Sequence, residues 1–598
     1  MRLPNRLRTF LGRPDALRWT VVLAVVLCLP SLATGWILDD RLHHTVVNSW
    51  ESFPALIRAP HDLYAFILDD PDWQWWVRER GTLPWYASEG VHASFWRPLT
   101  SWTVYWDHAA PWSSPVLAHV HSLIWYAVCV LVVGWLFRKI LGPGWVAALA
   151  TLVFAVDEAH AMPVAWIANR SSLLVMVFGA GALLAHIRWR RTSNPLVGLA
   201  APALLTLALL SGEMGLCFAA YFLAFAVFLD QGTLRGRLLS LVPTAAVCAA
   251  WRVVYVVNGY GVGGSGLYVD AANDPVRFGA AAIERIPVLL LAQLTPIPSY
   301  LGLALEESEA IAFVVVAAAI VVALLALAWR CLRRDPRAWF FATGMLLSVI
   351  PMASTLPHDR LLMPVGLGGA GLVALLLASV HVRAASGNVP RPARLLAVVW
   401  FVSHVIIAPL LLPVDTLAGR ALGAVFETAP NSLRGMDLDN RTLVFVTGPD
   451  FFLTSWAPVF LHDEGRATPS RVRVLGAGTG KVVVRRLDAE TLELECSTGF
   501  LNMPLDRTVW SPDHAFRVGQ VFELSDMSIR VGRVTDDGRP DTIRCRFDQP
   551  LESLDHVWVY WTADGYKRFV LPAVGQGMTI EAVSLGDIIA LALRGAGG

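Results

Sequence analysis

The sequence predicts a polytopic α-helical membrane protein of about 11 spans, followed by a mainly β C-terminal domain outside the membrane. Hydrophobic residues make up 55% of the 598 residues and charged residues only 16%, whereas a soluble protein has roughly 25% charged residues. Apolar runs long enough to cross a bilayer recur between Arg18 and Leu412, and after Leu412 short alternating β-forming segments replace them. The net charge of +1 gives no indication of nucleic-acid binding.

The positions of the arginines predict the orientation of the spans. Several arginines between Arg2 and Arg18 precede the first apolar run, so the positive-inside rule places the N-terminus in the cytoplasm. Further basic clusters follow every second span, as an alternating topology requires. The predicted spans are residues 18–36, 116–137, 145–156, 171–187, 196–210, 214–229, 238–257, 310–329, 338–354, 361–379 and 395–412.

Two segments have a second interpretation. Residues 280–298 are apolar, but they contain Glu284, Arg285 and three prolines, and counting them as a span would place the basic cluster 330–334 outside. We therefore expect an amphipathic or re-entrant piece on the outer surface. The first apolar run could be a cleaved signal peptide ending near Ala33, although its length favours a signal anchor.

The predicted organisation is a transmembrane domain at 1–413, a linker at 414–439 and an exterior β-rich domain at 440–598. An odd number of spans places this last domain in the periplasm if the chain lies in the cytoplasmic (inner) membrane. Its first part suggests an α/β start, with a strand in 441–450, a helix near 453–462 and a strand at 471–476.

The cysteines leave one question open in the exterior domain. Only Cys496 and Cys545 lie in that domain, and the exterior compartment permits oxidation. The alternatives are a disulfide between them and two buried free thiols on different strands.

Charged residues recur at the turns that this topology places on the exterior face. A single such residue is usually solvated at the interface, and Arg170 could reach the interface from the end of a span. Their recurrence on one side predicts a shared cavity instead. The candidates are Asp39 and Asp40 after the first span, Arg97 in the first loop, Asp157, Glu158, His160 and Arg170 after the third span, Glu213 after the fifth, and His358, Asp359 and Arg360 after the ninth.

Carboxylates and arginines at span ends suit group transfer from a lipid phosphate. A carboxylate can take the proton from an acceptor hydroxyl that attacks the anomeric carbon of a sugar. Arginines can hold the departing phosphate and stabilise its growing charge. A donor anchored in the bilayer meets both kinds of group only at the membrane surface.

The chain resembles the C-type glycosyltransferase superfamily (GT-C), and within it the protein O-mannosyltransferase-like branch that includes the transmembrane and tetratricopeptide-repeat proteins and their bacterial relatives. The family motif His-Pro-x-His-x-Glu-x-Val-x-x-x-x-x-Arg is matched by His160, Val164 and Arg170. Asp157, Glu158 and Met162 replace the first His, the Pro and the Glu of that motif, and the tetratricopeptide repeats are absent. The similar segments are 37–48, 95–108, 153–174, 211–215 and 357–369.

The resemblance implies a membrane glycosyltransferase of the cell envelope. It would move a sugar from a polyprenyl-phosphate-linked donor to a hydroxyl of a protein or glycan acceptor on the exterior face. It implies that Asp39 or Asp40 is the catalytic base. Further substrate-binding candidates are Arg97, Asp157, Glu158, His160, Arg170, Glu213, His358, Asp359 and Arg360.

Other functions stay open at this point. Asp39, Asp40 and Asp157 could hold Mg²⁺ or Mn²⁺ through carboxylate oxygens. A transporter or flippase for a lipid-linked or polar solute is one alternative to a transferase, and a catalytically inactive envelope scaffold is another. The sequence does not determine the sugar, the donor lipid or the acceptor.

Overall fold

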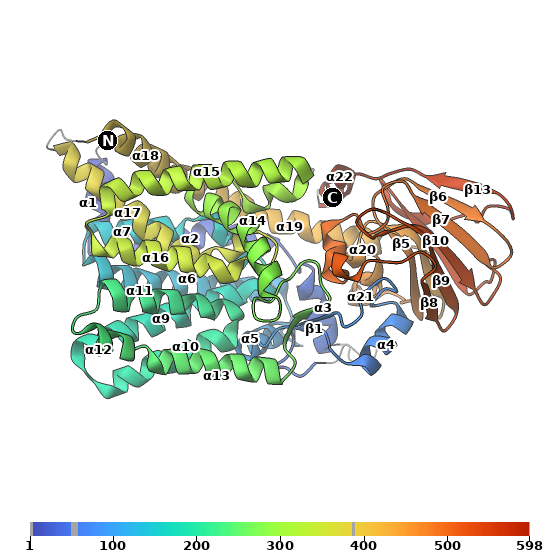
Figure 1. Ribbon diagram of the computed structural model, residues 1–598, viewed down its shortest axis with the longest axis horizontal. Helices are drawn as coiled ribbons and strands as arrows, with labels where there is room; N and C mark the ends of the chain where they lie inside the picture. The colour runs from blue at the N-terminus through green and yellow to red at the C-terminus, as the bar shows by residue number, and fades with distance from the viewer. Residues whose placement is uncertain (1–3, 49–57, 110, 306, 386–388, 597–598) are drawn as a thin grey trace.

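The computed structural model describes residues 4–48, 58–109, 111–305, 307–385 and 389–596. Figure 1 shows a helical bundle that lies end to end with a β-rich C-terminal domain, and the N-terminus lies at the bundle end far from that domain. The predicted fold class, a polytopic helical membrane protein with a C-terminal mainly β domain, is confirmed.

Seven helical segments in the described ranges are long and apolar enough to cross a membrane. The segment Ser308–Leu332 is only 11% buried within the protein, as expected for a helix that faces lipid. The helices of these segments are α2 (Ala16–Cys28), α6 (Pro115–Leu141), α9 (Ser171–Thr192), α12 (Leu234–Leu239) with α13 (Val242–Val257), α15 (Glu307–Leu332), α17 (Met363–Ala385), and α18 (Arg391–Phe401) with α19 (Ala408–Ser432).

The remaining predicted spans are helical but shorter or bent. The helix α7 (Trp145–Ala155) and the segment Glu158–Ala165 meet at an angle of 50° and give an eighth span if they are counted together. The helices α10 (Pro195–Ser211) and α11 (Cys217–Phe228) are apolar but short, and α16 (Pro336–Met352) has 17 residues. The part of the chain that the structure describes thus contains seven to eight candidate spans, fewer than the expected number of about 11.

The segment 280–298 forms most of helix α14 (Pro275–Leu294), which is not among the candidate spans. Asp274 caps its first turn by accepting a hydrogen bond from the Arg277 N–H at 3.0 Å. The inner face of α14 packs against α15 and α16. The interpretation of this segment as something other than a full span is in agreement with the structure.

One long helical rod connects the bundle to the C-terminal domain. It consists of α18, the π-helical turn Val402–Ile407 and α19, and it spans Arg391–Ser432 without a loop. The segment 414–439, expected to be a linker, is thus helical over most of its length. In Figure 1, α19 runs from the bundle to the C-terminal domain.

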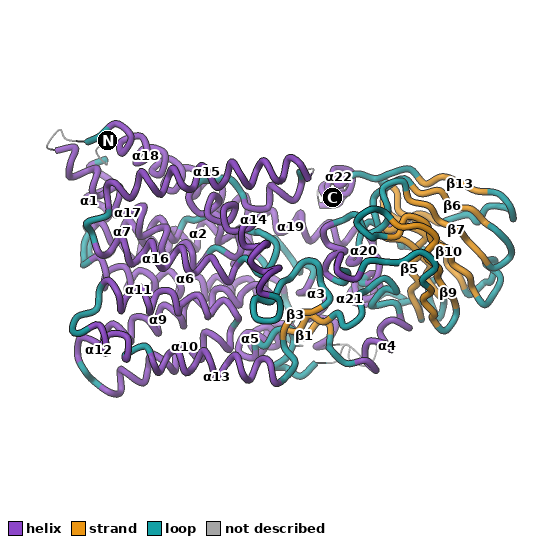
Figure 2. The backbone as a smooth tube through the Cα atoms, viewed as in Figure 1, coloured by secondary structure: helices purple, strands orange, loops and turns teal. Residues whose placement is uncertain are grey.

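The long first loop folds into a small layer at the end of the bundle. Figure 2 shows its short strands between the bundle and the C-terminal domain. A loop strand from elsewhere in the chain, β3, completes its antiparallel sheet in the order β1-β2-β3. The elements of the layer are α3 (Asp39–Asn48), β1 (Ala65–Ile67), α4 (Pro71–Arg80), β2 (His92–Ser94), α5 (Pro98–His108) and β3 (Gly261–Gly263).

The C-terminal domain contains two sheets. The four-stranded sheet has the order β12-β11-β4-β5, with β4 parallel to both of its neighbours, and the six-stranded sheet has the antiparallel order β13-β6-β7-β10-β9-β8. The predicted α/β start is confirmed by β4 (Thr442–Gly448), α20 (Phe451–Ser455), α21 (Ala457–Asp463) and β5 (Arg471–Ala477). The other elements are β6 (Val482–Arg486), β7 (Thr491–Cys496), β8 (Val521–Leu524), β9 (Met527–Val534), β10 (Pro540–Phe547), β11 (His556–Thr562), β12 (Gly565–Arg568), β13 (Gly577–Ile580) and α22 (Leu585–Ala596).

The disulfide hypothesis for Cys496 and Cys545 is wrong, because both are free thiols. They lie on the adjacent strands β7 and β10, but Cys545 is paired with Leu492. The two cysteines are therefore displaced by four residues along the strand, roughly 13 Å at the strand rise per residue, which is beyond the reach of a disulfide.

The C-terminal domain contacts the first-loop layer closely. The end of α4 approaches β5 so tightly that a Cβ atom at Gly81 would lie 2.0 Å from the Val472 carbonyl oxygen. The Trp85 indole N–H donates to the Val474 carbonyl at 3.0 Å. The helix α3 takes part as well, because Arg41 forms an ion pair with Asp463 of α21 at 3.1 Å.

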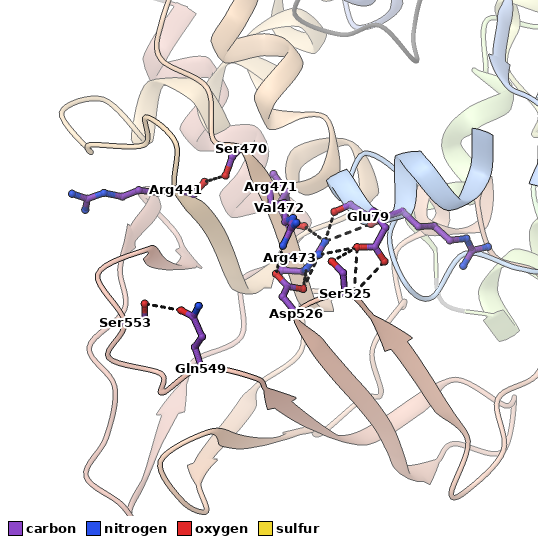
Figure 3. Close-up of polar contacts among 11 residues, drawn as sticks. Glu79, Arg441, Ser470, Arg471, Val472, Arg473, Ser525, Asp526, Gln549 and Ser553 are labelled. Atoms are coloured by element: carbon purple, nitrogen blue, oxygen red, sulfur yellow. Dashed lines mark hydrogen bonds and ion pairs between the residues drawn. The ribbon is translucent and has the colours of Figure 1, made fainter. Parts of the chain in front are cut away.

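Arg473 is the most buried charge at this contact, with a side chain that is 2% exposed (Figure 3). Its guanidinium lies 2.7 Å from the Asp526 carboxylate and 3.5 Å from the Glu79 carboxylate, and it donates to the Glu79 carbonyl oxygen at 2.9 Å. The arginine thus joins β5 to α4 and to the turn before β9.

Replacing Arg473 with methionine should destabilise the protein by about 3–5 kcal/mol, because Glu79 would lose its cation and Asp526 the closer of its two arginines. The measurement is the unfolding temperature of the purified full-length chain. Arg471→Met is a matched control, because Arg471 reaches the same Asp526 at 3.4 Å with a side chain that is 41% exposed. The control should cost less than about 1 kcal/mol. Equal losses in the two variants would contradict the role assigned to Arg473.

Candidate active site

A cavity of about 450 Å³ lies at the end of the bundle next to the first-loop layer. Its walls come from segments far apart in sequence: the start of α3, the start of α9, the turns before α11 and α17, and the loop after β3. Most of the exposed wall is apolar. The charged residues in the wall are Asp39, Arg97, Glu213, Arg252, Asp270 and Arg360.

Asp39 is the first residue of α3 and lies six residues after Ala33, the last residue of the first candidate span. Its side chain lines the cavity and is half-buried. Burial raises the pKa of Asp39 to about 6, and the positive charges of Arg360 and Arg97 lower it. Both arginines therefore act on this carboxylate across the cavity.

Asp40 points away from the cavity and is fully buried. One carboxylate oxygen accepts a hydrogen bond from the Ala168 N–H at 2.8 Å, and the other accepts one from the Ile37 N–H at 3.0 Å. Burial raises the pKa of Asp40 to about 8, and these two N–H groups lower it. Of the predicted acidic pair, only Asp39 is placed to meet a ligand in the cavity.

Arg97 and Glu213 form an ion pair in the cavity wall, with the Arg97 Nε 2.8 Å from the Glu213 carboxylate. The guanidinium also lies over the rings of Tyr64 and Phe95, at 5.1 and 4.8 Å from their centroids. Arg97 is thus held by three partners, and Glu213 neutralises most of its charge. The sequence predicted both residues for the shared cavity, and both line it.

Arg360 lines the cavity from the 3-10 turn Asp359–Leu361 before α17. Its guanidinium lies 5.1 Å from the centroid of the Trp166 ring, a distance suited to a cation–π contact. Among the described residues, no carboxylate forms an ion pair with Arg360. Its positive charge is therefore the one in this wall best able to meet an anionic ligand.

Arg252 and Asp270 are cavity residues that the sequence analysis missed. They form an ion pair at 3.0 Å, and both line the cavity. Arg252 lies inside the predicted span 238–257, and a charged residue within a span is itself a signal of function. The aromatic residues in the wall, Trp166 and Tyr255 among them, gave no comparable signal.

Asp157, Glu158 and His160, from the start of the motif after the third span, do not line the cavity, contrary to expectation, although Trp166 and Asn169 of the same motif do. Asp157 accepts hydrogen bonds from the Ala159 N–H at 3.1 Å and from the Gln293 amide at 3.1 Å. His160 is fully buried, with its Nδ1 3.1 Å from the Tyr126 hydroxyl. Glu158 has one buried carboxylate oxygen without a hydrogen-bond partner among the described residues.

Arg170 is also placed differently from the prediction. Its side chain is fully buried and does not line the cavity. It forms an ion pair with Asp107 and donates to the Ser122 hydroxyl at 3.0 Å and the Ala118 carbonyl at 2.8 Å. Arg170 therefore joins the start of α9 to α5 and α6, which is a role in the fold.

Arg170→Ala should lower the stability of the protein by about 3–5 kcal/mol, because Asp107, with a side chain only 11% exposed, would lose its arginine and keep only His121 as a partner. The measurement is the unfolding temperature of the purified variant. The double variant Arg170→Ala/Asp107→Ala should recover part of the loss, since the unpaired charge is then removed. A stable Arg170→Ala protein with weakened donor binding would contradict this role and support a ligand contact.

His358 and Asp359 precede Arg360 and shape its turn without lining the cavity. The His358 Nδ1 accepts a hydrogen bond from the Arg360 N–H at 3.2 Å, and burial lowers the pKa of His358 to about 3. The Asp359 carboxylate accepts from the backbone N–H and the hydroxyl of Ser299 at 2.8 and 2.6 Å. Burial raises the pKa of Asp359.

The carboxylates expected to share a Mg²⁺ or Mn²⁺ ion do not converge. Asp39 lines the cavity, Asp40 accepts two backbone N–H groups behind it, and Asp157 lies beside Gln293. Within the described ranges, a different group brings its ligand atoms together, namely Asp40, His43 and His108.

Comparison with known proteins supports the predicted resemblance. No protein-family model matches the chain. Protein O-mannosyl-transferase F38B6.6 of Caenorhabditis elegans is 31% identical over 211 residues, which are 34% of this chain and 27% of that protein. The chain is similar to a protein O-mannosyltransferase. The similarity covers only about a quarter of that relative's length.

Solved structures of membrane enzymes align with this structure, but their TM-scores are low. The apo oligosaccharyltransferase of Archaeoglobus fulgidus has a TM-score of 0.41 at 13% identity, over 76% of this chain and 64% of that chain. ArnT from Cupriavidus metallidurans, bound to undecaprenyl phosphate, has a TM-score of 0.35 at 15% identity, over 75% of this chain and 85% of that chain. No residue role follows from overlaps this low, so roles rest on the geometry of this chain.

Proposed function

We propose that the chain is a GT-C-type membrane glycosyltransferase that moves a sugar from a polyprenyl-phosphate-linked donor to an acceptor hydroxyl. The observation that supports this most is one cavity in which the Asp39 carboxylate lies within the electrostatic influence of Arg360 and Arg97. The cavity lies at span ends, where a donor anchored in the bilayer presents its phosphate.

The chemistry assigns a role to each charged group. The Asp39 carboxylate takes the proton of the acceptor hydroxyl while the hydroxyl oxygen bonds to the anomeric carbon of the sugar. The bond between that carbon and the phosphate oxygen breaks, and the phosphate leaves with the electron pair. Arg360 stabilises the negative charge that grows on the leaving phosphate. Arg97, held by Glu213, supplies a second, weaker positive potential.

The apolar part of the cavity suits the lipid part of such a donor. Side chains from the turn before α11, from α13 and from the end of α16, including Leu216, Trp251 and Ile350, form this part of the wall. Ile350 is 39% exposed, so the wall continues onto the outer surface of the bundle. An isoprenoid chain would bury apolar surface there and hold the phosphate near Arg360.

A protein or glycan acceptor would approach from the side of the C-terminal domain. This domain contacts α3 through Arg41 and His44, which lie within two turns of Asp39 on the same helix. The His44 Nδ1 lies 2.6 Å from the Asp463 carboxylate of α21. The domain would therefore help to fix the catalytic helix and cover the acceptor side of the site.

The proposed topology places the C-terminal domain outside the cytoplasmic (inner) membrane, with the N-terminus in the cytoplasm. The arginine clusters support this orientation through the positive-inside rule. A reporter that is active only in the cytoplasm, fused after Gly598, should stay inactive, and a reporter active only in the periplasm should be active there. The reverse result would contradict the topology and, with it, an exterior site.

The experiment that tests the function uses the full-length chain in lipid nanodiscs. The protein is incubated with a panel of polyprenyl-phosphate sugars and with envelope glycoproteins and glycans from cells that lack the chain. Mass spectrometry should detect one added hexose or other single sugar on an acceptor and release of the polyprenyl phosphate. Movement of intact donor across liposomes without transfer would identify a flippase, and absence of both would favour the inactive scaffold.

A further inference from the structure

Three buried side chains meet behind the wall that contains Asp39. Asp40 and His43 lie three residues apart on α3, so they share a face of the helix, and His108 is the last residue of α5. Asp40 and His108 are fully buried, and His43 is 1% exposed. One ligand atom from each residue lies within 4.8 Å of the other two.

The one ring hydrogen bond of His43 leaves its second ring nitrogen free for a ligand. The His43 Nε2 lies 3.2 Å from the Leu63 carbonyl oxygen. Because a carbonyl only accepts, Nε2 is the protonated nitrogen and Nδ1 has a free lone pair. This arrangement, a ring N–H held by a backbone carbonyl, is typical of metal-binding histidines.

Buried polar atoms without partners point to a missing ligand at the same place. The His43 Nδ1 and both ring nitrogens of His108 are buried and have no hydrogen-bond partner among the described residues. A buried donor or acceptor without a partner costs free energy, so such atoms usually indicate a bound ion or water. The surroundings of His108 are otherwise aromatic, with the Trp36 ring centroid 4.3 Å away.

The charge of Asp40 also favours a cation. No ion pair to Asp40 is found in the part of the chain that the structure describes, although its carboxylate is fully buried. Each of its oxygens accepts one backbone N–H and keeps a further lone pair. The nearby arginines, Arg97 and Arg170, are paired with Glu213 and Asp107, which limits their repulsion of a cation.

We propose that Asp40, His43 and His108 bind a divalent transition-metal ion, with Zn²⁺ as the preferred ion. Two imidazoles and a carboxylate match the ligand types of Zn²⁺, whereas Mg²⁺ and Ca²⁺ prefer oxygen ligands alone. With Zn–N bonds of about 2.0–2.1 Å, the ligand atoms of a tetrahedral site lie about 3.4 Å apart. Side-chain rotations that move each ligand atom by about 1 Å would bring the three atoms from within 4.8 Å to this separation. A water would take the fourth position.

The ion would join α3 to α5 directly behind the cavity. Because Asp40 follows Asp39 in the chain, the site would fix the first turn of α3 and hold the Asp39 backbone in place. Metal binding itself does not rest on the proposed glycosyl transfer, and it can be tested without any sugar donor.

The test measures metal binding by the full-length chain in detergent or nanodiscs. Protein stripped with a chelator is titrated with ZnCl₂, with CoCl₂ and, as a control ion, with MgCl₂. We expect one Zn²⁺ per chain by elemental analysis, visible absorption bands typical of low-coordinate Co²⁺, a higher unfolding temperature with Zn²⁺, and no change with Mg²⁺. A metal content below about 0.1 per chain together with unchanged stability would overturn the proposal.

Variants then assign the site. His108→Gln should weaken Zn²⁺ binding at least about 100-fold, because one of three protein ligands is lost. His119→Gln is a matched control, because His119 is fully buried like His108 but lies outside the triad, with its Nε2 3.0 Å from the Gly35 carbonyl oxygen. The control should bind Zn²⁺ as the wild type does. Wild-type affinity in His108→Gln, or equal losses in both variants, would place the ion elsewhere.

Discussion

Asp39→Asn should reduce sugar transfer about 10²–10⁴-fold, the usual effect of removing a general base. Asparagine keeps the shape of the side chain but cannot take the proton of the acceptor hydroxyl. Among the residues that the structure describes, no hydrogen bond holds the Asp39 side chain in the fold, in contrast to Asp40, so the variant should stay folded. The measurement is the initial rate of transfer in nanodiscs with saturating donor and acceptor.

Two controls make the Asp39 result specific. The variant should unfold within a few degrees of the wild type, which excludes a loss of structure. Asp72→Asn, an exposed substitution in α4 of the same first-loop layer, should leave the rate unchanged. A transfer rate for Asp39→Asn within about threefold of the wild-type rate would contradict the assignment of Asp39 as the base. Glu213, another carboxylate of the wall, would then be the next candidate.

Arg360→Ala should reduce kcat about 10²–10³-fold, because the growing charge on the leaving phosphate would lose its main cation. The KM for the donor should rise as well, since the same guanidinium contacts the phosphate before the reaction. Arg360→Lys should recover only part of the rate, because an ammonium group cannot form the paired contacts of a guanidinium. The measurement is kcat and KM for the donor in the two variants.

The stability of Arg360→Ala separates a chemical role from a structural one. Its cation–π contact with Trp166 contributes about 1 kcal/mol, so the unfolding temperature should fall only slightly. Arg334→Ala, in the basic cluster just after the C-terminal end of α15, is the control for removing an arginine that does not line the cavity. Unchanged kcat and KM in Arg360→Ala would contradict the assignment of the phosphate to this residue.

Much of the fold could be predicted from the sequence, because hydrophobicity and turn residues act locally. Each predicted span is a helix in the structure, and the strand–helix–strand start of the C-terminal domain lies where the pattern indicated. The count of spans was less certain, because helices such as α10 and α11 are shorter than a bilayer is thick and are completed by their neighbours. The continuation of α19 through residues 414–432 was not predicted, because residues 414–439 were interpreted as a linker.

The candidate site was predicted in part. Sequence position indicates which end of a span a residue occupies, and this was enough to bring Asp39, Arg97, Glu213 and Arg360 together. It does not indicate the direction of a side chain. Arg170 lies at the same end of the bundle but points toward Asp107 and α6, so only the structure could exclude it from the cavity wall.

The rod of α18 and α19 determines how far the C-terminal domain stands from the bilayer. Its 42 residues extend about 63 Å, roughly twice the ~30 Å hydrocarbon thickness, so a rod that enters the bilayer near Arg391 would project about half of its length beyond the lipid. Each residue added to the projecting half would raise the domain by about 1.5 Å and turn it by about 100° around the axis. The contacts of Arg473 and Gly81 between the C-terminal domain and the first loop form in only one orientation of the domain around the rod axis. The number of residues in the rod must therefore preserve this orientation. Length changes in evolution or by design would therefore be tolerated in multiples of whole turns, with a matching change in the first loop, rather than one residue at a time.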